Sequence, residues 1–312
     1  MYISVIIPTR NRASELNIAL ESIEQQNLPQ DEFEVLVVDN GSIDNTGDVV
    51  KSFRDKIINL RYFFEPTPGL HVGRHCGLKN ANTDILVFAD DDIRAFPTWL
   101  TAIKSIFEQN PEVVLVGGKN LPDYEIEPPT WVLNLWSQCK YGKCLGYYSI
   151  LDFGDDIKEI SPYYVWGCNF SIRRKVLLGV GGFHPDGMPK ELLEYRGDGE
   201  TAVSAAIAAN HWKTIYHPAA SVYHLVSKQR MTVAYLYNRA YAQGISDSYT
   251  KIRADNGLLE AARSRSTSNR EMDLVKRTLR NGYEDGYAFH QLKVRSNPDI
   301  LSWVLRKDYF DV

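Results

Sequence analysis

The sequence predicts an α/β fold that ends in a helical extension, and two observations carry this prediction. Across the first 120 residues, short β-rich runs alternate with helical patterns, as in a parallel sheet built from βαβ units. After His224, the chain changes to long helical patterns. The predicted strands cover residues 3–7, 34–38, 60–64, 85–89 and 113–116. Ligands of such sheets bind outside the carboxyl ends of the strands, so we expect functional residues directly after them.

Helical patterns fill the gaps between these strands. After the first strand, an apolar stripe with the spacing i, i+3, i+4, i+7 predicts a helix that packs on the sheet. The stripe consists of Leu16, Ala19, Leu20 and Ile23. Pro97 begins a later helix, and Asn110 followed by Pro111 ends it.

The second part of the chain is less regular. Residues 121–163 show no clear period but are rich in Trp and Tyr, which predicts an ordered insertion or a long loop. Patterning returns at residues 164–173, and a helix over 200–210 and a strand near 214–216 follow.

In the C-terminal tail, Ser268 and Glu271 form a capping-box pattern, and Asn297 precedes a first-turn proline. We therefore divide the chain into residues 1–224, with halves 1–120 and 121–224, and a helical extension over 225–312.

Composition excludes several classes of protein. The 312 residues are 44% hydrophobic and 24% charged, as in an ordinary globular chain. A net charge of −4 gives no general attraction to polyanions, so we expect no nucleic-acid partner. No apolar run approaches the roughly 18 residues that a membrane span needs, and no signal-peptide pattern precedes the first strand. We expect a cytoplasmic protein. The four cysteines form no CxxC pair, which predicts reduced thiols.

Three acidic residues follow the predicted strand 85–89. In an extended segment, residues i and i+2 project to the same side, so we expect Asp90 and Asp92 to converge while Asp91 faces away. Paired carboxylates repel unless a hard cation binds them, and Mg²⁺ or Mn²⁺ suits such oxygen ligands. The alternative is a cluster of helix-capping acids ahead of Pro97.

A second acidic cluster contains Asp198 and Glu200, with glycines on both sides of Asp198. Glu200 opens the predicted helix and is a candidate general base for an acceptor hydroxyl, with helix capping as the alternative. His224 is a candidate metal ligand or a core histidine. Asp39 ends a strand, where doubly wound folds hold a ribose, but it also fits an ordinary turn. No GxGxxG or P-loop motif follows the first strand.

Taken together, these segments resemble glycosyltransferase family 2. SVIIPTRNR (4–12) and VVDNGS (37–42) look like the two nucleotide-binding segments of the family, and FADDD (88–92) matches its DxD position. GLHVGRHCG (69–77) is similar to a segment that usually reads GxxxARNxG, with His75 in place of asparagine. GCNFSIR (167–173) followed by GGF (181–183) resembles the acceptor-side segment.

The resemblance implies a fold and a role for each matching residue. It implies a GT-A type, Rossmann-like mixed sheet flanked by helices, with a nucleotide-binding half over 1–120 and an acceptor-binding half over 121–224. It implies Mn²⁺ or Mg²⁺ as the cofactor, held by Asp92 and His224. The family's catalytic aspartate falls on Glu200, with Asp198 two residues earlier as the alternative base. The implied nucleotide-sugar residues are Pro8, Thr9, Arg10, Asn11, Asp39, Arg74, Asp90 and Asp91. The implied acceptor residues are Trp166 and Asn169.

The implied reaction moves a sugar from a nucleotide-sugar donor, preferably a UDP-sugar, to a carbohydrate or lipid-linked acceptor with inversion. Three alternatives remain: a retaining transferase, a nucleotidyltransferase on the same scaffold, and a non-catalytic carbohydrate-binding protein. The C-terminal helices are candidates for a homodimer interface or for peripheral contact with the inner face of the membrane.

Overall fold

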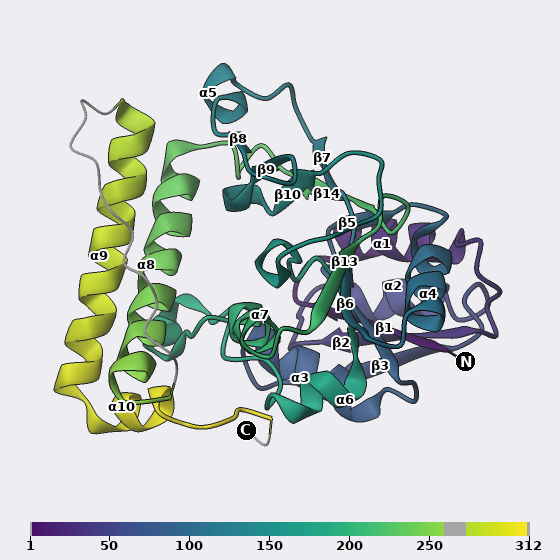
Figure 1. Ribbon diagram of the computed structural model, residues 1–312, viewed down its shortest axis with the longest axis horizontal. Coiled ribbons are helices and arrows are strands. Elements are labelled where there is room, and N and C mark those ends of the chain that lie inside the picture. Colours follow the sequence, from purple (N-terminus) through teal and green to yellow (C-terminus); the bar gives the residue numbers. More distant parts are fainter. Residues whose placement is uncertain (1, 259–272, 311–312) are drawn as a thin grey trace.

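The computed structural model describes residues 2–258 and 273–310, which form two sheets, their flanking helices and a helical hairpin at one side (Figure 1). In these residues the larger sheet has eight strands. In spatial order they are β11 (Lys158–Glu159), β13 (Lys213–Tyr216), β6 (Val113–Gly117), β12 (Asn169–Arg173), β4 (Ile85–Ala89), β1 (Ile3–Thr9), β2 (Phe33–Asp39) and β3 (Leu60–Phe64). The sheet is mixed, because β12 lies antiparallel between β4 and β6, and β11 lies antiparallel to β13.

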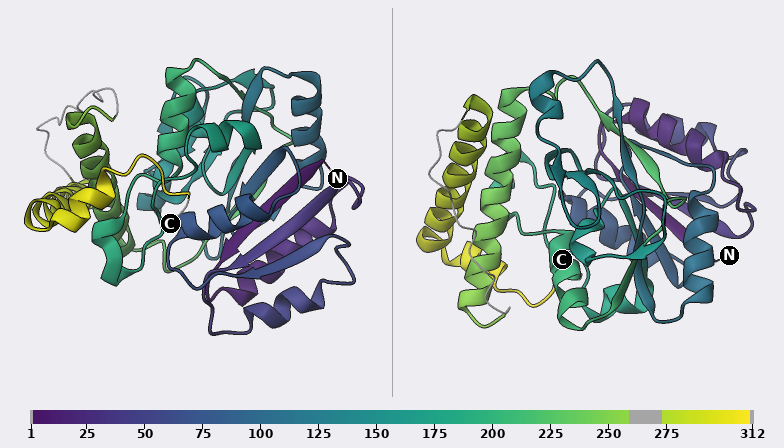
Figure 2. Two further views of the ribbon diagram at one scale, coloured as in Figure 1. Left: turned by 90° about the horizontal axis from the view of Figure 1, so that it is seen from below. Right: turned by 45° about the horizontal axis from the view of Figure 1, so that its top comes forward.

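All five strands predicted from the sequence are confirmed, each to within two residues at either end. Alternate residues of the central strands enter two different cores because helices cover both faces of the sheet (Figure 2). Val5 and Val37 face α1 (Ala13–Glu24), α2 (Thr46–Ser52) and α4 (Trp99–Gln109). Ile6 and Leu36 face α3 (Leu70–Asn80), α6 (Arg174–Gly179) and α7 (Glu200–Ala209).

Residues 121–163 are ordered, as expected from their aromatic content, and they build most of the smaller sheet. Its strands, in spatial order, are β5 (Ile93–Ala95), β14 (Val222–Val226), β7 (Asn120–Tyr124), β10 (Ile150–Asp152), β9 (Lys143–Leu145) and β8 (Ser137–Gln138). The intervening helices are α5 (Thr130–Leu133) and the 3₁₀ turns η1 (Gly146–Tyr148), η2 (Pro162–Tyr164) and η3 (Lys190–Tyr195). Strands of two or three residues, such as β8, β9 and β10, are too short to show a period in the sequence.

The C-terminal tail is helical, as predicted, and contains α8 (Val233–Asp255), α9 (Leu274–Ser296) and α10 (Pro298–Val304). The first two lie side by side at the edge of the molecule (Figures 1 and 2). Glycines at the contact allow this close approach: a methyl group on Gly244 or Gly286 would overlap the backbone of the facing helix.

None of the described helices combines the length and the apolar composition that a membrane span requires.

Asn297 caps α10 as predicted, because its side-chain oxygen accepts a hydrogen bond from the backbone N–H of Asp299. The capping-box pattern at Ser268 and Glu271 lies outside the described residues.

Candidate functional site

The three acidic residues after β4 lie in a turn and not in an extended segment. The expectation that Asp91 faces away from its neighbours is therefore wrong. Asp91 accepts a hydrogen bond of 2.7 Å from the Thr9 hydroxyl, and its other oxygen lies 3.3 Å from Nε of Arg12. The same guanidinium donates a 2.8 Å hydrogen bond to Asp92. Arg12 thus joins two of the three carboxylates.

Burial and charge act differently on these neighbouring carboxylates. Burial raises the pKa of Asp91 to about 7, although Arg12 opposes the shift. Burial would also raise the pKa of Asp92, but His224, Arg12 and Arg230 hold it well below its usual range. Asp92 therefore stays ionised in a buried position, as a metal ligand must.

His224 lies inside β14, not after it, and its imidazole points to Asp92. Its Nδ1 is 2.8 Å from the carbonyl oxygen of Tyr148, so Nδ1 donates its proton there, and in the neutral imidazole Nε2 is then an acceptor. That Nε2 lies 3.2 Å from Oδ1 of Asp92, and both atoms are buried without a hydrogen-bond partner among the described residues. Two such acceptors repel each other unless a proton or a cation lies between them. This pair of atoms fits a divalent cation, since carboxylate oxygen and imidazole nitrogen are both Mn²⁺ ligands.

Asp90 and the thiol of Cys168 stand beside the same imidazole. A carboxylate oxygen of Asp90, Sγ of Cys168 and a ring nitrogen of His224 all lie within 4.8 Å of one another. Burial and the neighbouring carboxylates, first among them Asp90, raise the pKa of the Cys168 thiol. A single cysteine forms no sequence motif, so Cys168 was not predicted at this site. All four cysteines are free, as predicted.

Glu200 is linked to the acidic turn through Arg74. One carboxylate oxygen lies 3.3 Å from Nη1 of Arg74, and the other accepts a hydrogen bond from the backbone N–H of Gly167. The buried Arg74 guanidinium also lies 3.5 Å from Asp90. A methyl group on Gly167 would overlap this guanidinium, so glycine is needed there. The structure therefore brings Glu200 and Asp90 to one site.

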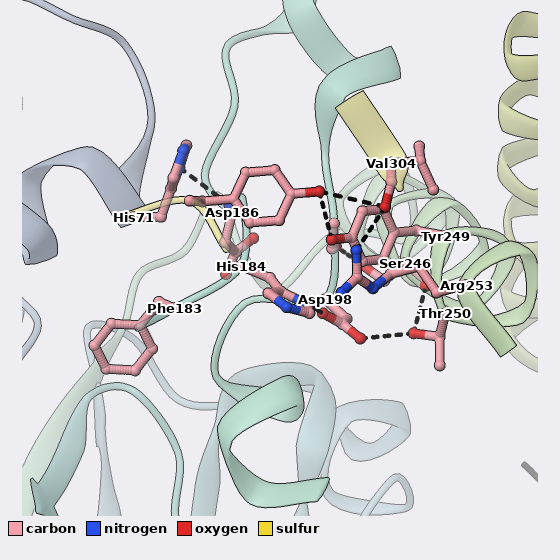
Figure 3. A network of polar contacts seen from close by, with 12 residues as sticks. His71, Phe183, His184, Asp186, Asp198, Ser246, Tyr249, Thr250, Arg253 and Val304 are labelled. Atoms are coloured by element: carbon pink, nitrogen blue, oxygen red, sulfur yellow. Dashed lines mark hydrogen bonds and ion pairs between the residues drawn. The ribbon is translucent and has the colours of Figure 1, made fainter. Parts of the chain in front are cut away.

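Asp198 points elsewhere, although it precedes Glu200 by only two residues. One oxygen lies 2.6 Å from Nδ1 of His184, and the other accepts a 2.8 Å hydrogen bond from the Thr250 hydroxyl of α8 (Figure 3). Asp198 is buried in this network. Of the two candidate bases, only Glu200 contacts Arg74, which links it to the acidic turn.

We expect Thr250→Val to lower the free energy of unfolding by about 1.5–3 kcal/mol, because it removes a hydrogen bond to a buried carboxylate. Urea denaturation measures the change, and Thr250→Ser, which keeps the hydroxyl, is the matched control. An equal loss in both variants would contradict the role given to this hydrogen bond.

The other residues predicted to bind the nucleotide follow β1 and β2. Thr9 and Asp39 are register partners at the ends of these parallel strands. Asp39 accepts hydrogen bonds of 2.7 Å from the Tyr62 hydroxyl and the backbone N–H of Ser42. Pro8 is buried in β1, and Arg10 and Asn11 are exposed in the loop that follows.

The two predicted acceptor residues differ in position. Asn169 is fully buried, and its amide bonds to Trp99, Asn120 and the carbonyl of Ala220. Both N–H groups of its amide thus have partners within the protein, and its assignment as an acceptor residue stays a prediction. The half-buried Trp166 donates its Nε1–H to the carbonyl oxygen of Tyr163.

Two arginines at the site were missed by the sequence reasoning. Arg12 lies in the segment 4–12, so that motif already contained it. Arg230 lies 3.3 Å from Asp92 but follows β14 in a segment without a motif, and nothing in the sequence indicated it.

At position 75, this chain has a histidine where related segments have an asparagine, and its hydrogen bonds explain why the histidine fits. Its Nδ1–H donates to the carbonyl oxygen of Tyr309, and Nε2 accepts a hydrogen bond from the backbone N–H of Phe183. One donor and one acceptor are also what an asparagine amide offers. The contact ties the C-terminal tail to α3.

Three buried histidines predict how stability depends on pH. Burial lowers the pKa of His75 to about 3 and those of His71 and His290 to about 4. Because these values lie below the unfolded value of about 6.5, the unfolded state takes up protons first as pH falls. The contribution of these histidines to stability is thus complete above about pH 6.5 and falls below it by up to about 1.4 kcal/mol per pH unit for each histidine, while Asp91, with its raised pKa, acts in the opposite direction.

Urea unfolding between about pH 7.5 and 5.5 measures this slope. His290→Gln should reduce it, and His211→Gln, at an exposed position, should not. A stability that stays constant across this window would contradict the neutral assignment of the three histidines.

The sequence is similar to those of several known proteins. Residues 4–180 match the family model described as Glycosyl transferase family 2. The chain is 24% identical over 255 residues to the glucosyl-dolichyl phosphate glucuronosyltransferase of Haloferax volcanii, covering 79% of this chain and 76% of that protein. It is 36% identical over 103 residues to the validoxylamine A glucosyltransferase of Streptomyces hygroscopicus, covering 32% of this chain and 24% of that protein. With glycosyltransferase AglE of Haloferax volcanii, the identity is 35% over 100 residues, covering 32% of this chain. The chain spans 33% of AglE, so it covers a third or less of these last two relatives.

Solved structures agree on the fold. The mannosyltransferase PcManGT from Pyrobaculum calidifontis, in complex with GDP-Man and Mn²⁺, superposes with a TM-score of 0.57 at 20% identity, covering 97% of this chain and 72% of that one. TarS 1–349 from Staphylococcus aureus, in complex with UDP-GlcNAc, gives a TM-score of 0.53 at 16% identity, covering 95% and 92%. These likenesses confirm the mixed α/β fold flanked by helices that the sequence predicted.

Proposed function

Because the chain belongs to glycosyl transferase family 2, we propose that it is a metal-dependent, inverting glycosyltransferase. It moves a sugar from a nucleoside-diphosphate sugar, a UDP-sugar ahead of GDP- or dTDP-sugars, to a hydroxyl of a carbohydrate or lipid-linked acceptor. The observation that carries this proposal is the line of contacts from Glu200 through Arg74 to Asp90, beside His224. It puts a candidate base and a candidate metal site next to each other.

We assign the metal to Asp92 and His224. Their buried, unpartnered Oδ1 and Nε2 atoms support Mn²⁺, and the carboxylates of the turn also suit Mg²⁺. When bound there, a divalent cation supplies the positive charge that a departing diphosphate requires. The Mn²⁺ in the GDP-Man complex of the Pyrobaculum calidifontis mannosyltransferase supports this assignment.

We assign the general base to Glu200 and not to Asp198. Arg74 and the backbone N–H of Gly167 hold both carboxylate oxygens of Glu200 in position. Glu200 takes the proton of the acceptor hydroxyl while the acceptor oxygen attacks the anomeric carbon from the face opposite to the leaving diphosphate. A single displacement of this kind inverts the anomeric configuration.

We propose that the half over 1–120 binds the nucleotide, the half over 121–224 binds the acceptor, and residues 225–312 are a helical extension. Pro8, Thr9, Arg10, Asn11 and Asp39 stand at the carboxyl ends of β1 and β2, where α/β sheets bind nucleotides. We assign Arg74, Asp90 and Asp91 to the part of the site that binds the diphosphate.

A donor screen tests the proposal. We expect Mn²⁺-dependent release of UDP from a UDP-sugar, and NMR of the product should show an inverted anomeric linkage. A retained linkage would contradict inversion, and release of pyrophosphate would indicate nucleotidyl transfer instead. Calorimetry without any metal-dependent heat for UDP, GDP or dTDP would favour a non-catalytic binding protein. Sedimentation and liposome flotation separately test the dimer and membrane alternatives for the C-terminal helices.

A further inference from the structure

The proposed reaction has no use for the thiol of Cys168, although this thiol stands at the metal site. Cys168 directly precedes β12 and is 1% exposed. Its Sγ, a carboxylate oxygen of Asp90 and a ring nitrogen of His224 lie within 4.8 Å of one another. The three groups come from the end of β4, the start of β12 and the middle of β14, so three segments far apart in the sequence supply them.

The present partners of the thiol are weak. Its sulfur accepts a hydrogen bond of 3.3 Å from Nδ2 of Asn120, and its S–H makes a long 3.8 Å contact with the carbonyl oxygen of Ser149. Independently of the cysteine, the buried Nε2 of His224 has no hydrogen-bond partner among the described residues. An imidazole nitrogen beside a carboxylate and a thiol is a typical zinc ligand set.

The spacing of the three groups is close to what such an ion needs. Ligands of a tetrahedral zinc ion lie roughly 3.5 Å apart, since the metal–ligand bonds are about 2.0–2.3 Å long. A contraction of about one ångström, within the reach of side-chain rotation, therefore suffices to close the present triangle around an ion.

We propose that this site also binds thiophilic cations, Zn²⁺ or Cd²⁺, through Cys168, Asp90 and His224, and that this binding blocks sugar transfer. The metal–sulfur bond forms while the thiol proton leaves to water. Hard Mg²⁺ and Mn²⁺ prefer oxygen ligands and leave the thiol protonated, so the two kinds of cation use different ligand sets around one imidazole. They exclude each other because both need His224. The inhibition rests on the proposed function, whereas the thiolate ligation does not.

The first test is a Cd²⁺ titration followed by the ultraviolet charge-transfer absorption of a thiolate–metal bond. Cys76, Cys139 and Cys144 carry free thiols of their own, so the background is the Cys76→Ser/Cys139→Ser/Cys144→Ser variant. We expect this variant to show the band and to lose it when Cys168→Ser is added. A band of equal size after Cys168→Ser, or no band before it, would overturn the proposal.

A second measurement does not depend on how well Cys168→Ser folds. Zinc-edge X-ray absorption of the Cys76→Ser/Cys139→Ser/Cys144→Ser variant loaded with one equivalent of Zn²⁺ should show one sulfur at about 2.3 Å among nitrogen and oxygen ligands. A shell of nitrogen and oxygen alone would reject Cys168 as a ligand.

Inhibition then separates this proposal from the proposed function. In a folded Cys168→Ser variant, the Zn²⁺ concentration that halves Mn²⁺-dependent transfer should rise by about tenfold or more. A sulfur signal without transfer from any donor would refute only the glycosyltransferase assignment. Transfer that Zn²⁺ inhibits equally with and without Cys168 would refute only the thiolate site.

Discussion

Glu200→Gln is expected to lower kcat for sugar transfer by about 10²–10⁴-fold, the range that a positioned general base contributes. Glutamine keeps the size of the side chain and the hydrogen bond from Gly167 to its oxygen, but it cannot take a proton from the acceptor. The affinity for the donor, measured by calorimetry with a UDP-sugar and Mn²⁺, should change little in comparison. The defect should therefore appear in kcat and not in donor binding.

Glu191→Gln is the matched control, because this exposed glutamate on η3 lies in the same segment and makes no contact with the acidic turn. Its kcat should equal that of the unchanged chain. A Glu200→Gln variant within a factor of about three of normal turnover would exclude Glu200 as the base.

Asp92→Asn is expected to abolish metal-dependent transfer, with a loss of metal affinity of at least about a hundredfold. Substitutions of groups that only support a metal ligand already cost about 10–100-fold, and Asp92 is assigned as the ligand itself. The substitution also leaves Arg12, Arg230 and His224 without the carboxylate that they share, so some stability should be lost as well. Titration with Mn²⁺, followed by electron paramagnetic resonance, measures the affinity directly.

Asp123→Asn provides the control for Asp92→Asn. Asp123 lies in β7, its ion pair with Arg94 is exposed, and such pairs contribute about 0–1 kcal/mol. Mn²⁺ affinity should be normal in this variant. If Asp92→Asn binds Mn²⁺ as tightly as Asp123→Asn does, the metal does not use Asp92.

The sequence was most informative where one physical rule decides the structure. Strands such as β4 are continuous apolar runs because both faces of the sheet are covered, and their carboxyl ends therefore located Thr9, Asp39 and Asp90. The family match confirms the resemblance that rested on these motifs. By contrast, the strands of the smaller sheet were not predicted, since β8 and β9 are too short to carry a period.

Side-chain directions were harder to predict than positions. Asp91 turns toward Thr9 because the chain leaves the strand at this point, and a strand rule does not apply within a turn. Asp198 and Glu200 look equivalent in the sequence. The contact between Asp198 and Thr250 depends on where α8 packs, and no local pattern encodes that packing. The contacts of Asn169 were not predictable for the same reason, because its three partners are all distant in the sequence.

The two arginines that contact Asp92 have a consequence for how donor and cation arrive. Guanidinium groups bind phosphate oxygens as readily as carboxylates, so under the proposed function an incoming diphosphate would compete with Asp92 for Arg12 and Arg230. Arg12 and Arg230 contact the same oxygen of Asp92, Oδ2, so this oxygen becomes free for the cation only when both arginines turn to the nucleotide. Nucleotide and cation are then thermodynamically coupled, and the factor by which one improves the affinity of the other is the same in both directions. In the structure, the two arginines are built-in counter-ions for Asp91 and Asp92, while Arg74 pairs with Asp90.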